Sequence, residues 1–153
     1  MQELMAIVFT DQDSAERLAA SIAALEPGQR SWLKDAALVA RDQAGDVVTY
    51  ELPGLIGEGE FGGLFWGFLF ALIFWTKWWD LSIPLTIQDD FVKSAGEAMG
   101  KGDSGLFIFT SDGDAALQVL DGLPALREQR VDVVRSALEP SELGLIQRTF
   151  RKK

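Results

Sequence analysis

The sequence predicts an α+β fold of the ferredoxin-like type, interrupted by one inserted hydrophobic, glycine-rich helix. Two observations carry this prediction. A strand, an acidic helix cap, an Ala/Leu-rich helix and a Val-rich strand occur in this order twice, once in each half of the chain. A hydrophobic segment, residues 59–79, lies between the two copies of this pattern. It carries no charge from Phe61 to Trp75. Two βαβ units in one small chain favour a mixed or antiparallel sheet with its helices on one face.

The first half contains a strand, a helix and a hairpin. Apolar residues from Leu4 to Thr10 predict the strand, and helical spacing from Ala15 to Leu25 predicts the helix. Residues 36–41 and 47–52 are rich in apolar and β-branched side chains, and a short Gly-containing turn separates them. This arrangement is typical of a β-hairpin.

The second half follows the same plan with one additional helix before it. A helix is predicted from Asp89 to Met99, followed by a buried strand from Leu106 to Thr110. Asp112 caps the next helix, and Val131 to Val134 form the Val-rich strand. A last amphipathic helix is predicted from Ser141 to Phe150.

We therefore divide the chain into three parts. Residues 1–54 are the first half of an α+β domain, residues 55–87 are the inserted apolar and aromatic segment, and residues 88–153 are the second half of the same domain. A chain of 153 residues and 16.8 kDa suits one domain with a real core.

Composition excludes several classes of function. The net charge of −9 argues against nucleic-acid binding, because phosphates need a basic surface. Cysteine and histidine are both absent, which removes the commonest general base, the commonest zinc ligand and every thiolate nucleophile. We predict no catalytic, cofactor-binding or metal-binding residue and therefore no enzyme. The start of the chain lacks the pattern of a secretory signal, so we expect a cytoplasmic location or the cytoplasmic side of a membrane.

Acidic pairs stand at the starts of three predicted helices. Such carboxylates either cap the helix or bind a hard cation, and capping is by far the commoner role in this position. We interpret all three pairs as caps. The pairs are Asp11 with Asp13, Asp89 with Asp90, and Asp112 with Asp114.

The inserted segment has the pattern of an assembly surface. Small residues recur at every fourth position, which on a helix forms a groove that another backbone can approach closely, as in a glycine zipper. The groove residues are Gly59, Gly63, Gly67 and Ala71. Large aromatic side chains accompany them and are typical of a membrane or oligomer interface. These aromatic residues are Phe65, Trp66, Trp75, Trp78 and Trp79.

Three arrangements of this segment are open. It is a helix that dips into one leaflet, a helix that bundles with its copies, or a core helix of a monomer. The uncharged run makes a helix of about 22 Å, short of the ~30 Å hydrocarbon core. A single full pass would also place the two halves of the sheet on opposite sides of the bilayer. The core-helix alternative is the weakest, because the segment is apolar on all sides and its interior glycines are unfavourable in a helix.

Several short motifs, in their order along the chain, resemble the domain of unknown function 1269 family of small bacterial proteins. The motifs are Ile7-Val8-Phe9 with its acidic cap, Phe65-Trp66-Gly67, Asp89-Asp90-Phe91, Ser104-Gly105-Leu106-Phe107 and Glu139-Pro140-Ser141. The resemblance implies membrane association, with no agreed activity and no catalytic residues. Members typically have a glycine-rich hairpin, whereas this chain shows no second small-residue arm after Trp79.

We accordingly expect a non-enzymatic, membrane-associated homo-oligomer whose partners are copies of itself and membrane lipid. The alternative is a soluble, oligomeric regulatory or small-ligand-binding module that buries the apolar helix in its interface; the sequence names no ligand. Glu58 and Glu60 are either favourable first-turn acids or a carboxylate ring at a pore mouth. The basic tail is either a frayed helix end or a contact with lipid headgroups. The tail residues are Arg148, Arg151, Lys152 and Lys153.

Overall fold

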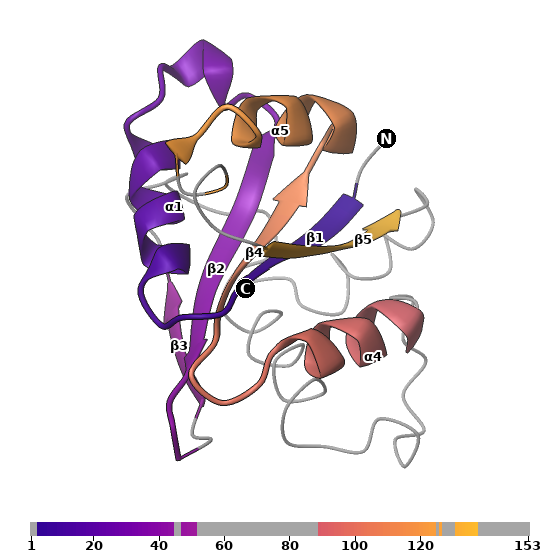
Figure 1. Cartoon of the computed structure of the whole chain (residues 1–153). Coiled ribbons are helices and arrows are strands. Elements are labelled where there is room, and N and C mark those ends of the chain that lie inside the picture. Colours follow the sequence, from indigo (N-terminus) through magenta and orange to yellow (C-terminus); the bar gives the residue numbers. More distant parts are fainter. Residues whose placement is uncertain (1–2, 45–46, 52–88, 125, 127–130, 138–153) are drawn as a thin grey trace, which may run out of the picture.

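The computed structural model is an α+β domain built on one five-stranded antiparallel sheet with the strand order β3-β2-β4-β1-β5 (Figure 1). The structure describes residues 3–44, 47–51, 89–124, 126 and 131–137. The elements in chain order are β1 (Glu3–Phe9), α1 (Ser14–Ala23), the short helix η1 (Pro27–Gln29), β2 (Leu33–Arg41), β3 (Val47–Glu51), α4 (Asp89–Ala98), β4 (Ser104–Thr110), α5 (Gly113–Leu120) and β5 (Val131–Ala137).

Each strand and helix that the sequence predicted within these residues is present, with ends that move by a few positions. The α+β class is confirmed. The sheet is antiparallel at every described pairing, so the mixed sheet that the sequence left open is not formed. The predicted helix from Ser141 to Phe150 lies outside the described residues.

The two halves of the chain share this sheet. Strands β1 and β4 are neighbours at its centre, β2 pairs with β4, and β5 pairs with β1. Strand β2 of the first half and β5 of the second are therefore each hydrogen-bonded to the central strand of the other half. Among the described strands, only the pair of β2 and β3 lies within one half.

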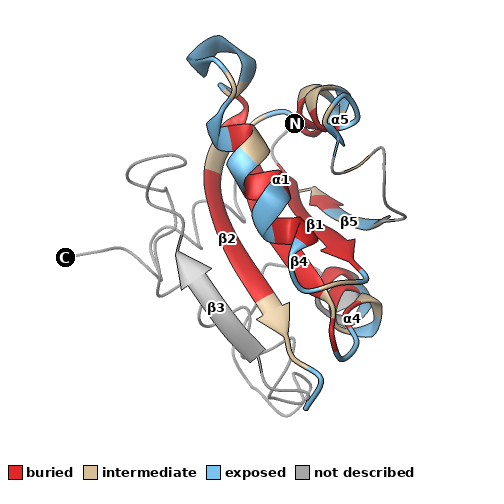
Figure 2. Cartoon of the chain, turned by 60° about the vertical axis from the view of Figure 1, so that its left-hand side comes forward, coloured by how far each residue is buried: buried red, intermediate tan, exposed pale blue. Residues whose placement is uncertain are grey.

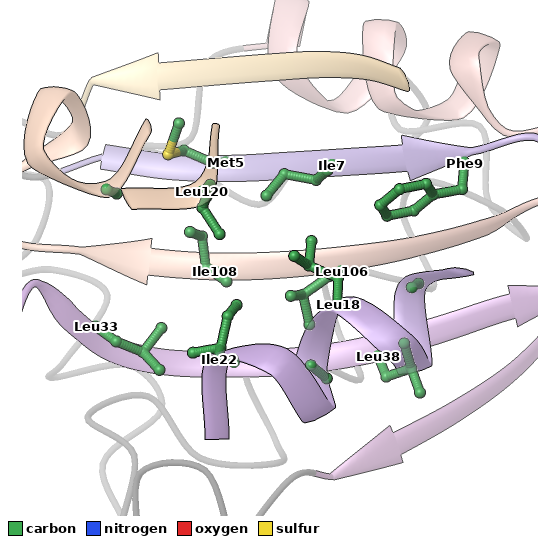
Figure 3. Close-up of a cluster of buried hydrophobic side chains, with 14 of the residues drawn as sticks. Met5, Ile7, Phe9, Leu18, Ile22, Leu33, Leu38, Leu106, Ile108 and Leu120 are labelled. Atoms are coloured by element: carbon green, nitrogen blue, oxygen red, sulfur yellow. The ribbon is translucent and has the colours of Figure 1, made fainter. Parts of the chain in front are cut away.

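One face of the sheet is covered by α1 and α5, the two helices that connect the strands within each half (Figures 1 and 2). Alternate residues of the strands point to this face, and the apolar stripe of α1 lies over them. Each fully buried aliphatic side chain contributes about 1.5–3 kcal/mol. The principal members of this core, shown in Figure 3, are Met5, Ile7, Phe9, Leu18, Ile22, Leu33, Leu38, Leu106, Ile108 and Leu120.

Helix α4 lies on the opposite face, so the expectation of helices on one face is wrong for this helix. Its Phe91 ring meets the Phe107 ring edge to face, with centroids 6.3 Å apart and planes at 89°. At its end, Met99 packs where Gly105 has no side chain. The physical reason lies in the central strands: all seven residues of β1 and of β4 are buried, so the sheet is apolar on both faces.

Candidate functional site

The residues predicted to form the assembly and membrane surface lie outside the described residues. This holds for the glycine groove, the aromatic residues beside it, Glu58, Glu60 and the basic tail. Within the described part of the chain, no helix combines the length and the apolar character needed to cross a membrane.

The two attachment points of residues 52–88 are described: one is the end of β3 and the other is the start of α4, which packs on the sheet. Glu51 ends β3 and is paired with Ala37 of β2, which is paired in turn with Phe107 of β4. Phe91, in the first turn of α4, packs on the Phe107 ring. Adjacent strands are about 4.8 Å apart. The residues that flank 52–88 thus belong to the same domain, one at the end of β3 and the other in a helix that packs on the sheet.

One acid of each pair at two of the helix starts is a cap, as predicted, namely Asp11 and Asp112. The prediction is wrong for their companions, because Asp13 makes no cap hydrogen bond and Asp114 binds Arg135 instead. The Asp11 carboxylate accepts hydrogen bonds from the backbone N–H groups of Asp13 (2.9 Å) and Ser14 (2.6 Å), and also from the Ser14 hydroxyl (2.6 Å). The Asp112 carboxylate accepts one from the backbone N–H of Ala115 at 3.1 Å. Both caps satisfy N–H groups that a helix leaves without an internal partner. Among the described residues there is no group of three or more acids that could hold a metal ion.

A buried ion pair connects the first strand to the last. Arg135 of β5 donates two parallel hydrogen bonds to Glu3 of β1, with nitrogen–oxygen distances of 2.8 and 2.7 Å. A third, to the Asp114 carboxylate of α5, measures 3.1 Å. The Glu3 side chain is only 10% exposed, whereas that of Arg135 is 36% exposed. The hydrogen bond to Glu3 is the main cause that raises the pKa of the Arg135 guanidinium above its ordinary value, so this group stays positively charged.

Gly113 is required where α5 begins over this ion pair. A Cβ atom at Gly113 would collide with the Glu3 carboxylate and would lie 2.8 Å from Nη2 of Arg135. The missing side chain lets the positive end of the helix approach the Glu3 carboxylate. The ion pair thus lies between β1, β5 and α5, and its role is structural because it holds these three elements together.

A second polar cluster holds the end of α4 against β2. Arg41, the last residue of β2, donates a hydrogen bond from Nη1 to the carbonyl oxygen of Met99 at 3.0 Å, and a cation there suits the negative end of the helix. Asp103 accepts a hydrogen bond from the backbone N–H of Gly100 at 2.7 Å. Gly102 adopts a left-handed conformation with φ of +83° and donates from its N–H to the Arg41 carbonyl at 2.8 Å. These contacts fix the position of α4.

The outer strand β5 has two features that its neighbours lack. Val133, on the face covered by α1 and α5, is 38% exposed and is the single exposed large hydrophobic residue among those that the structure describes. Ser136, on the α4 face, is 3% exposed, and its hydroxyl has no hydrogen-bond partner. A buried hydroxyl without a partner costs about 1–3 kcal/mol.

No protein-family model matches the chain, and no curated protein or solved structure matches it either.

Sequence reasoning missed the ion pair of Glu3 and Arg135. Glu3 is a lone charge in an otherwise apolar strand, and a lone charge that is to be buried needs a partner of opposite sign. That signal was available, but the pairing itself depends on β1 and β5 being neighbours. The two residues are 132 positions apart in the chain, and no local pattern indicates their contact.

Proposed function

We propose that the chain is a non-enzymatic, membrane-associated homo-oligomer on the cytoplasmic side of a membrane. In this proposal it assembles through the helix groove of Gly59, Gly63, Gly67 and Ala71. The support from sequence is the long uncharged run with small residues at every fourth position, which suits close helix contact in lipid or between copies. The resemblance to the domain of unknown function 1269 family agrees with membrane association.

The observation that carries the proposal is the place where residues 52–88 join the fold. Their two ends are attached to the same domain, at Glu51 of β3 and at the first turn of α4, whose Phe91 packs on Phe107 of the sheet. One bilayer crossing would separate the ends of a segment by about 30 Å. The geometry therefore favours a segment that enters one leaflet and returns, or that bundles with its copies, over a single pass.

We also propose that the domain has a ferredoxin-like fold. Without the edge strand β3, the strand order is β2-β4-β1-β5, and the helices α1 and α5 each connect two strands of the same direction across a strand of the other half. This arrangement supports a ferredoxin-like sandwich formed by two split βαβ units. The apolar segment then enters as an insertion between β3 and α4.

The proposal is tested by extracting membranes with carbonate and by size-exclusion chromatography of the full chain in mild detergent. We expect the protein to stay with the membrane and to elute as an oligomer once detergent releases it. A soluble monomer without detergent would overturn the proposal. A soluble oligomer would instead favour the regulatory or ligand-binding module that hides the apolar helix in its interface.

The groove itself is tested with the double variant Gly63→Leu and Gly67→Leu. Two leucines on the groove keep helices apart, so we expect a lower oligomeric state in the same detergent. Gly28→Leu is the matched control, because a Cβ atom at Gly28 meets nothing within 4 Å. An unchanged oligomer in the double variant would show that the groove is not the interface.

A further inference from the structure

We draw no further inference here: the strongest candidate, the surface patch at the outer edge of β5 around the exposed Val133, also carries the charges of Asp132 and Arg135, and nothing among the described residues shows what covers it.

Discussion

Helix α1 begins beside Ser104, the first residue of β4, whereas α5 begins above Glu3, the first residue of β1. The two halves thus place their helices in equivalent positions, each over the start of the other half's central strand. The contacts differ in strength. The backbone N–H of Ala15 donates to the buried Ser104 hydroxyl at 3.3 Å, a long neutral hydrogen bond. The Glu3 carboxylate instead pairs with Arg135 directly under α5.

This difference explains the residues with which the two helices begin. Ser14, at the start of α1, has room for a side chain, and its hydroxyl binds Asp11. Gly113, at the start of α5, has no room, because the Glu3 carboxylate occupies the space that a Cβ atom needs. The second half therefore depends on one buried ion pair and one glycine, and the first half depends on an ordinary cap.

The largest effect should come from Gly113→Ala. The added methyl group has to displace Glu3, which is held by Arg135, or lift α5 from the sheet. We expect a loss of about 2–4 kcal/mol in the free energy of unfolding, measured by denaturant titration. Ser14→Ala is the matched variant in the first half and should cost at most about 1 kcal/mol, since it removes the hydroxyl bond to Asp11 and a longer one accepted from the exposed Arg17. Equal losses at the two positions would show that the halves do not differ as described.

A smaller loss in the free energy of unfolding is expected from Arg135→Ala, which leaves the Glu3 carboxylate buried without its cation. Breaking a fully buried pair costs about 3–5 kcal/mol, but the Arg135 side chain is 36% exposed, so solvent screening lowers our expectation to about 2 kcal/mol. Arg17→Ala is the control, because Arg17 lies 4.0 Å from Asp11 and is 64% exposed. If the double variant Glu3→Gln with Arg135→Met is no more stable than Arg135→Ala, the unpaired carboxylate is not the cause of the loss.

The smallest effects should come from the two caps. Asp112→Ala removes one hydrogen bond to the start of α5 and should cost about 1 kcal/mol. Asp11→Ala should cost more, toward about 2 kcal/mol, because Asp11 accepts from two backbone N–H groups and from Ser14. Chemical denaturation of both variants checks the order, and a larger loss from Asp112→Ala would reverse our assignment of the stronger cap to the first half.

Much of the fold could be predicted from local patterns. Apolar runs predicted the central strands, helical spacing predicted α1, and Asp11 after β1 and Asp112 after β4 were correctly interpreted as caps. These signals are local, because a cap or a turn acts within a few residues of itself. The position of α4 could not be predicted in the same way. Strands that are apolar on both faces do not indicate which helix covers which face.

Of the candidate surfaces, one can be predicted from the sequence and the other is seen only in the structure. The groove of Gly59, Gly63, Gly67 and Ala71 is visible in the sequence, because its spacing matches the repeat of a helix. The edge of β5 is not visible there. The segment VDVVRSA becomes an edge only because β1 lies between it and β4, and that order is a property of the whole sheet.

The sequence by itself determined the elements, their caps, the acidic charge and the apolar insertion, since each depends on neighbouring residues or on composition. Only the tertiary structure decided the strand order in which the two halves share the sheet, that α4 covers the second face, and that Glu3 meets Arg135. The physical reason is that these contacts join residues far apart in the chain. Such contacts stabilise the protein only when the strands are already side by side.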